Sequence, residues 1–253
     1  MKTTRMKLIR YPFLIIPVFL LLLSNSSSSL NEEQASKHIS LSPLPDTSNE
    51  KGLLNFTELY DKWNLEATGL SKEAFKMAQK GYATLEEKHV LTKNNLLTIV
   101  DYSKSSTQKR LFVLDMKTGE MLFNSLVAHG RRSGQKYATD FSNKEDSHKS
   151  SLGFFVTLNT YFGENGYSLK LKGCETGIND KAYNRAIVMH GADYVSEKFI
   201  RQNGYLGRSH GCPAVPREIS KKIIDIIKGG SCMFLYYPSE KYLTVKIIFP
   251  LQF

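Results

Sequence analysis

A cysteine and a neighbouring histidine form the most informative stretch of this sequence. Cys212 lies between Gly211 and Pro213, and His210 precedes it by two positions. Glycine allows backbone angles that other residues avoid and proline fixes the next φ, so such a turn can present a side chain while aligning successive N–H groups. A cysteine nucleophile needs a side chain presented in this way, and the oxyanion-binding site beside it needs aligned N–H groups. The other interpretation is a buried structural cysteine in a tight turn.

A thiol at this position needs activation before it can attack a carbonyl group. An unperturbed cysteine, with a pKa of about 8.5, is only slightly ionised at neutral pH. Arg208, His210 and the N-terminus of a helix expected to have Pro216 in its first turn are the candidate sources of positive charge. His190 is the candidate base, because it ends the apolar run 185–189 and a strand end is a rigid mount. Considered alone, His190 also fits a core histidine.

Metal binding is the rival use of cysteine and histidine. Cys212, His210 and His190 are three possible ligands, but the sequence contains no C-x-x-C and no H-E-x-x-H pattern. We therefore expect no metal and no other cofactor. His129, in the segment 128–130, is a further candidate for lining a substrate cleft.

Short strands and a few helices must position these groups. The apolar runs that indicate strands are 96–101, 110–115, 121–128, 152–159, 167–171, 185–190, 232–237 and 244–248. Residues 117–120 indicate a hairpin turn. Helical spacing occurs at 56–63, after a capping Ser71, and from Pro216 to the pair Gly229-Gly230. We expect a β-rich α+β fold, with a mixed β-sheet or sandwich and a small helical N-terminal appendage.

The N-terminus has the organisation of an export signal. Residues 1–11 are basic without an acidic residue, residues 12–23 are apolar, and a serine-rich tract follows. A helix of that apolar length would reach about 18 Å, short of the ~30 Å hydrocarbon core. We expect a signal peptide over residues 1–29, with an uncleaved anchor that tethers the protein to the membrane through residues 12–23 as the alternative. The protein is then exported to the periplasm or cell envelope.

Composition excludes several classes of protein. The mean hydropathy of −0.30 excludes a polytopic membrane protein. The 34 basic and 24 acidic residues give a net charge of +10, part of which lies in the leader, so charge alone indicates no nucleic-acid partner. Three cysteines are too few for a disulfide scaffold, and a Cys174–Cys232 bond is left open. No dedicated protein partner is indicated.

The histidine and cysteine segments resemble the murein L,D-transpeptidase family, whose catalytic domain is called YkuD-type. Its signature is a His-Gly pair, a gap and then Ser/Thr-His-Gly-Cys. The matching pieces here are His190-Gly191 and Ser209-His210-Gly211-Cys212. Flanking segments that resemble one branch of the family are 128–130, 141–143, 147–153 and 185–196. Residues 213–215 depart from the better-known members, so the acyl acceptor does not carry over.

The resemblance implies a role for each residue. Cys212 would attack the carbonyl of the L-configured centre of a diamino acid in a peptidoglycan stem tetrapeptide, expelling D-alanine. His190, oriented by the carbonyl of Gly191, would accept the thiol proton. The groups expected at the oxyanion are the N–H groups of Gly211 and Cys212, with His210. The residues expected to contact substrate are Arg208, Ser209 and His129. The thioester would pass to an amine of a neighbouring stem and form a 3–3 cross-link.

The sequence therefore predicts an exported cysteine L,D-transpeptidase, with peptidoglycan stem peptides as its partners. The expected division is a tether over residues 30–52, a helical region over 53–92 and a catalytic domain over 93–253. An L,D-carboxypeptidase would use the same site with water as acceptor, and a peptidoglycan-binding module would keep Cys212 as a structural residue. A papain-like protease fits less well, because its nucleophile precedes its histidine whereas His190 precedes Cys212.

Overall fold

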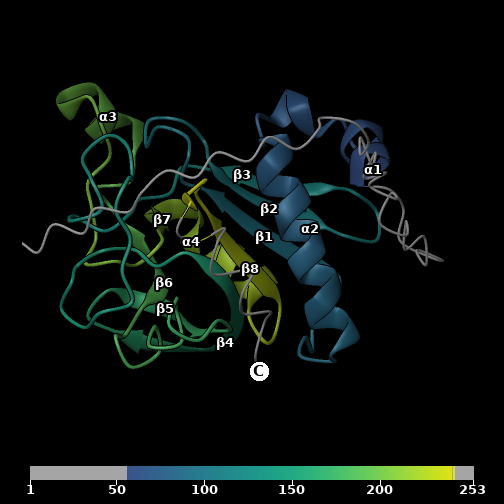
Figure 1. Ribbon diagram of the computed structural model, residues 1–253. Coiled ribbons are helices and arrows are strands. Elements are labelled where there is room, and N and C mark those ends of the chain that lie inside the picture. The colour runs from purple at the N-terminus through teal and green to yellow at the C-terminus, as the bar shows by residue number, and fades with distance from the viewer. Residues whose placement is uncertain (1–55, 241, 243–253) are drawn as a thin grey trace, which may run out of the picture. The chain divides into compact units, whose positions relative to one another are not determined.

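A mixed sheet of eight strands is the frame of the part of the chain that the structure describes (Figure 1). The computed structural model describes residues 56–240 and 242, so the leader, the tether and the run 244–248 lie outside it. The strand order is β3-β2-β1-β8-β4-β5-β6-β7. The strands are β1 (Leu96–Asp101), β2 (Leu111–Asp115), β3 (Met121–Ser125), β4 (Gly153–Gly163), β5 (Gly166–Gly173), β6 (Val188–Ala192), β7 (Ala214–Pro216) and β8 (Cys232–Tyr236). The predicted β-rich α+β fold is confirmed.

Two parallel pairings make the sheet mixed. Strand β1 runs parallel to β8, and β6 runs parallel to β7, while the other neighbours are antiparallel. In the β6–β7 pair, His190 lies opposite Ala214. A parallel pair needs a crossover connection, and here residues 193–213 supply it. The segment that contains Cys212 is therefore brought back beside the strand that carries His190.

Helices complete the fold, and the helical N-terminal residues pack on the sheet. They are α1 (Phe56–Lys62), the 3-10 helix η1 (Leu65–Thr68), α2 (Lys72–Glu87), α3 (Glu197–Asn203) and α4 (Arg217–Ile227). The Ser71 side chain caps α2 as predicted, since its oxygen accepts from the N–H of Ala74. A Cβ at Gly81 would lie 2.0 Å from the ring of Phe154, so glycine permits the close approach of α2 to the sheet. None of the described helices is long and apolar enough to cross a membrane.

Several element boundaries differ from those expected. Strand β6 begins at Val188 rather than at residue 185, because Ala186 adopts a φ of 52° that interrupts an extended chain. It continues to Ala192, so His190 lies within the strand and not at its end as expected. Strand β7 was not expected, and neither was α3. Pro216 caps α4 instead of lying in its first turn, so a strand separates Cys212 from the start of that helix. The predicted hairpin at 117–120 is confirmed, with Gly119 at φ 79°.

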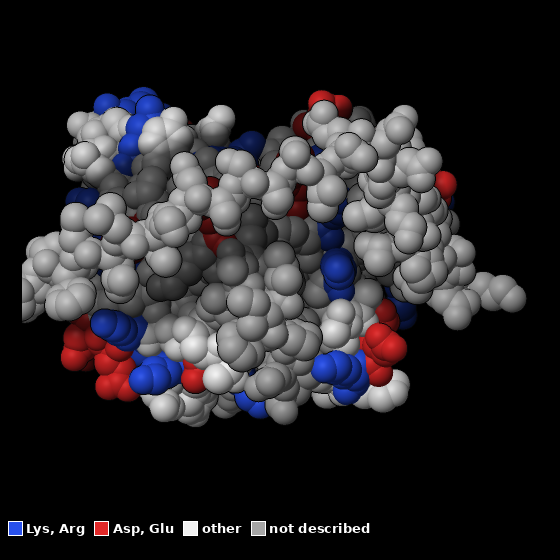
Figure 2. Space-filling view, viewed as in Figure 1, with Lys and Arg blue, Asp and Glu red and all other residues white. Residues whose placement is uncertain are grey.

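Charges on the visible surface are mixed. Along the lower edge of the face in Figure 2, basic and acidic side chains alternate among the described residues. Asp225 on α4 forms two of the described ion pairs, one with Lys221 on the same helix and one with Lys228, the residue that follows the helix. Exposed pairs of this kind contribute little to stability.

Candidate active site

His190 is held rigidly on β6. Its side chain is buried, and its Nδ1 lies 3.1 Å from the carbonyl oxygen of Gly191. An N–H on Nδ1 donates to that oxygen, which leaves Nε2 as an unprotonated acceptor. A Cβ at Gly191 would lie 2.5 Å from Ser220 Oγ and 3.1 Å from Arg217 Cα, so α4 packs directly behind this glycine. The imidazole is thus oriented by its own strand, with one nitrogen free to take a proton.

Cys212 lies beside the same strand. The N–H of Val188 donates to Cys212 Sγ at 3.5 Å, and the thiol lies 3.8 Å from the carbonyl oxygen of Ala186. Val188 precedes His190 by two residues, and Cys212 precedes Ala214, the partner of His190, by two residues. The structure therefore places the thiol against Val188, on the strand that also carries His190. The cysteine is 8% exposed, so it meets solvent only slightly.

Burial keeps both groups neutral at rest. It raises the pKa of the Cys212 thiol, although the Val188 N–H and the charge of Arg185 oppose this rise. Burial also lowers the pKa of His190, helped by the charge of Arg217 and opposed by the Gly191 hydrogen bond. A protonated thiol with a neutral imidazole as its base is suited to general-base catalysis, in which the proton moves only as the sulfur attacks.

Arg185 is a site residue that the sequence analysis missed. Its guanidinium is half-buried and donates to the carbonyl oxygens of Ser142 (2.6 Å) and Lys149 (2.7 Å) and to the hydroxyl of Ser151 (2.6 Å). Its charge also opposes the rise in the pKa of Cys212 that burial causes. No motif identifies it, because it precedes the strand and approaches the thiol only through the fold. Arg208 instead donates to the carbonyl oxygen of Gly134 at 3.1 Å.

Replacing Arg185 by glutamine is expected to raise the pKa of Cys212 further, because a charge that favours the thiolate is removed. The pH dependence of iodoacetamide modification measures this pKa directly. Arg185→Lys keeps the charge and should stay closer to the wild-type profile. A glutamine variant that folds normally and shows an unchanged profile would contradict this role.

The turn before the cysteine is braced from within. Ser209 Oγ donates to the carbonyl oxygen of Cys212 at 2.7 Å and accepts from the N–H of Gly211 at 3.0 Å. The N–H of Gly211 is therefore occupied, whereas that of Cys212 has no acceptor among the described residues. This corrects the expectation that both N–H groups face an oxyanion. Ser209 is 5% exposed and supports the turn rather than presenting its hydroxyl to substrate.

His129 is buried beneath the turn and does not line its surface. Its Nδ1 accepts from Arg110 at 2.8 Å, and its Nε2 lies 3.3 Å from the carbonyl oxygen of Gly134. Burial and the charge of Arg110 lower its pKa to about 3, so it stays neutral. Its backbone oxygen accepts from the N–H of Ser209 at 3.0 Å. The expected substrate contact is thus replaced by a supporting one, because both ring nitrogens are engaged inside the protein.

His210 and His190 lie in different environments. The ring of His210 is exposed and stacks on that of His148, with centroids 4.4 Å apart. His190 is buried on the strand. His210 therefore lies on an exposed turn, whereas His190 lies on the strand whose Val188 N–H contacts the thiol.

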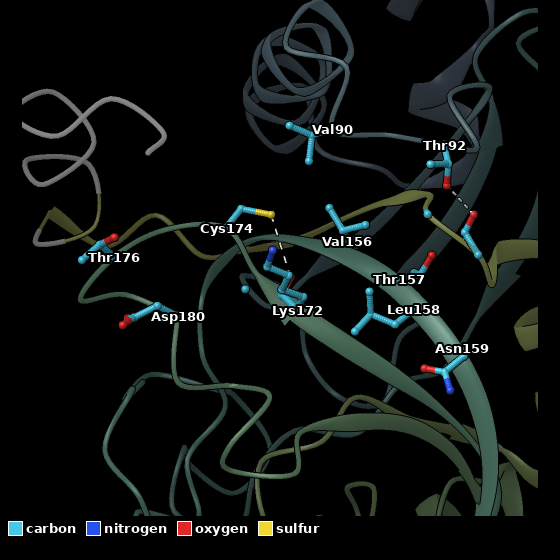
Figure 3. Close-up of a pocket in the computed structure, with 13 residues that line it drawn as sticks. Val90, Thr92, Val156, Thr157, Leu158, Asn159, Lys172, Cys174, Thr176 and Asp180 are labelled. Atoms are coloured by element: carbon cyan, nitrogen blue, oxygen red, sulfur yellow. Dashed lines mark hydrogen bonds between the residues drawn. The ribbon is translucent and has the colours of Figure 1, made fainter. Parts of the chain in front are cut away.

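The other cysteines lie apart from this site. A cavity of about 670 Å³ beside β4 and β5 is lined by Cys174, Val156 and Leu158 among others (Figure 3). None of the candidate active-site residues described in this section lines it. The pKa of Cys174 is raised to about 12, mainly by burial. Cys232 is buried on β8, and no disulfide joins any of the three cysteines. Cys174 and Cys232 therefore serve as internal controls for chemistry at Cys212.

A buried cysteine and an oriented histidine on a mixed sheet define a candidate thiol acyltransferase site. A family model described as an L,D-transpeptidase catalytic domain matches residues 66–236. The chain belongs to this family, which confirms the resemblance seen in the sequence. No curated protein matches the chain.

Solved structures similar to the chain are distant in sequence. An L,D-transpeptidase from Mycobacterium smegmatis is 14% identical, with a TM-score of 0.35, over 56% of this chain and 59% of the other. One from Stackebrandtia nassauensis is also 14% identical, with a TM-score of 0.35, over 59% of each chain. L,D-transpeptidase 1 of Mycobacterium tuberculosis is 12% identical, with a TM-score of 0.32, over 56% of this chain and 62% of the other. The chain spans less than two thirds of the length of these proteins.

Proposed function

We propose that this protein is an exported cysteine L,D-transpeptidase that acts on peptidoglycan stem tetrapeptides. Family membership supports the class of enzyme. The observation that carries the proposal is the contact of Cys212 Sγ with the N–H of Val188 on the strand that also carries His190. The Gly191 carbonyl orients that imidazole with Nε2 free. A thiol in the turn before β7, held against β6, and a base carried by β6 are suited to act as a nucleophile–base pair.

In the proposed acylation step, Cys212 attacks the carbonyl carbon of the diamino acid. A C–S bond forms while the thiol proton moves to Nε2 of His190. The N–H of Cys212 is available to donate to the developing oxyanion, and the exposed His210 adjoins it. The C–N bond to the terminal D-alanine then breaks, and His190 returns the proton to the leaving amine. The products are a thioester and free D-alanine.

In the second step an amine of a neighbouring stem attacks the thioester carbon. A C–N bond forms, the C–S bond breaks, and the amine proton passes through His190 to the departing sulfur. One amide is exchanged for another, so the reaction needs no external energy source. The product is a 3–3 cross-link. Attack by water instead would give a shortened stem and an L,D-carboxypeptidase.

The proposed location follows from the substrate and the leader. We infer a signal peptide over residues 1–29 or an anchor at 12–23, a tether over 30–52, a helical region over 53–92 and a catalytic domain over 93–253. This organisation places the enzyme in the periplasm or cell envelope, where stem peptides lie. N-terminal sequencing of envelope protein tests it; a protein that begins at Met1 and stays in the cytoplasm would contradict it.

Incubation with defined tetrapeptide stems, followed by mass analysis, tests the activity. We expect an adduct on Cys212 with the mass of the stem minus D-alanine, together with free D-alanine and a cross-linked dimer. A tripeptide without dimer would assign the carboxypeptidase reaction. Neither adduct nor D-alanine from folded protein would contradict catalysis and support a binding module.

A further inference from the structure

Three turns meet beside Cys212, at residues 130–134, 147–150 and 209–212. Gly130 forms a parallel bridge to Ser209, and the N–H of Arg132 donates to the carbonyl oxygen of His148 at 3.2 Å. Ser150 Oγ joins all three, since it accepts from the N–H of Gly130 at 3.0 Å and donates to the carbonyl oxygen of Gly211 at 3.1 Å. Side chains carried by any one turn are therefore held close to the other two.

The turns approach one another too closely for any residue larger than glycine at position 130. A Cβ at Gly130 would lie 2.6 Å from the carbonyl oxygen of His148 and 3.0 Å from Gly211 Cα. These neighbours are backbone atoms, which cannot move aside as a flexible side chain does. The arrangement of the three turns is thus rigid, as a specific binding site requires.

The first turn brings positive charge that no acidic residue neutralises. Arg131 and Arg132 are both exposed, and neither has an ion-pair partner among the described residues. The nearby Lys149 is paired with Asp140. The guanidinium of Arg208 donates a hydrogen bond to the carbonyl oxygen of Gly134. Two guanidinium groups therefore remain available beside the turn that carries the thiol.

A stacked histidine pair lies at the same junction. The rings of His148 and His210 are 4.4 Å apart and inclined by 29°. His148 has a φ of 54°, uncommon outside glycine, and its buried Nδ1 has no hydrogen-bond partner among the described residues. Desolvation and the charges of Arg131, His210 and Arg132 lower the pKa of His148, and Asp146 opposes them. The pair thus adds polar ring atoms to a positively charged surface.

We propose that Arg131, Arg132 and the His148–His210 pair form a subsite for the terminal carboxylate of the acyl donor. The inference rests on the proposed function, because it places the scissile carbonyl at Cys212. One N–Cα–C unit separates that carbonyl from the carboxylate of a single leaving residue, a span of about 4 Å. An anion site for the leaving residue must therefore adjoin the thiol. Guanidinium groups bind carboxylates through paired N–H donors.

A first test needs no substrate. Iodoacetate carries a carboxylate and iodoacetamide does not, so the ratio of their rates at Cys212 reports local positive charge. In Arg131→Gln/Arg132→Gln this ratio should fall about threefold or more, as expected for two charges within a Debye length. Lys62→Gln/Lys80→Gln on α1 and α2 removes the same charge elsewhere and should leave the ratio unchanged. An equal fall in both variants would overturn the proposal.

A second test uses tetrapeptides that end in D-alanine or in D-alaninamide. The wild type should lose about tenfold or more in kcat/KM with the amide, the range expected for a lost charge-assisted hydrogen bond. The Arg131→Gln/Arg132→Gln variant should show less than about a threefold difference between the two peptides. His148→Ala should reduce the difference as well. If the variant discriminates as strongly as the wild type, the subsite is wrong.

The two tests separate the subsite from the proposed function. If neither peptide is turned over by folded wild-type protein, the proposed function fails, while the alkylation ratio still reports whether the basic turn attracts carboxylates. If both peptides are turned over equally by the wild type, the function stands and the subsite fails. Circular dichroism of each variant establishes that it has folded.

Discussion

Cys212→Ala is expected to abolish formation of the acyl-enzyme and all turnover of tetrapeptide stems, because no other group in the site can form the thioester. The fold should survive. The substitution removes a small side chain and leaves the N–H of Val188 without its sulfur partner, which costs about 1–3 kcal/mol. Mass analysis for the adduct and urea denaturation measure the two effects separately.

Cys174→Ala is the matched control. Its thiol lies in a separate cavity and has a pKa of about 12, so its removal should leave turnover nearly unchanged. Cys232→Ala should also keep its activity once folded, although this residue is buried on β8 and its loss leaves a small void. Near-normal turnover by Cys212→Ala would show that the nucleophile is misassigned.

His190→Ala is expected to lower the acylation rate by a factor of about 10² or more, as loss of a general base does. The same substitution should remove the acid limb of the pH–rate profile. The neutral imidazole is the active form, so activity falls as the pH drops through the pKa of His190. Because burial lowers that pKa, the wild type should stay active to a lower pH than an ordinary histidine would allow.

His210→Ala is the comparison that assigns the base. The ring of His210 is exposed and stacked on His148, whereas His190 is buried on strand β6. Its removal should weaken turnover through the turn while preserving the acid limb. Single-turnover acylation rates across pH measure both variants. An acid limb that persists in His190→Ala and disappears in His210→Ala would reverse the two roles.

Sequence alone predicted the elements whose signals are local. The cap at Ser71, the hairpin at 117–120 and most strands depend on residues near each other in the chain, so their patterns are visible without the fold. Cys212 and His190 were also proposed from sequence, because a Gly-Cys-Pro turn and a histidine that follows an apolar run are local features. The sequence likewise showed the family through two short motifs.

Tertiary structure decided what surrounds those two residues. The charge of Arg185 acts on the thiol from the turn that precedes β6, and His129 is held inside the protein because Arg110, from a different segment, binds its ring. Strand β7 is three residues long, too short for any periodicity to reveal. The subsite proposed here depends on turns far apart in sequence, whose convergence arises from strand order and long-range hydrogen bonds. Residue spacing in the sequence does not predict such contacts, because they depend on which distant segments pair.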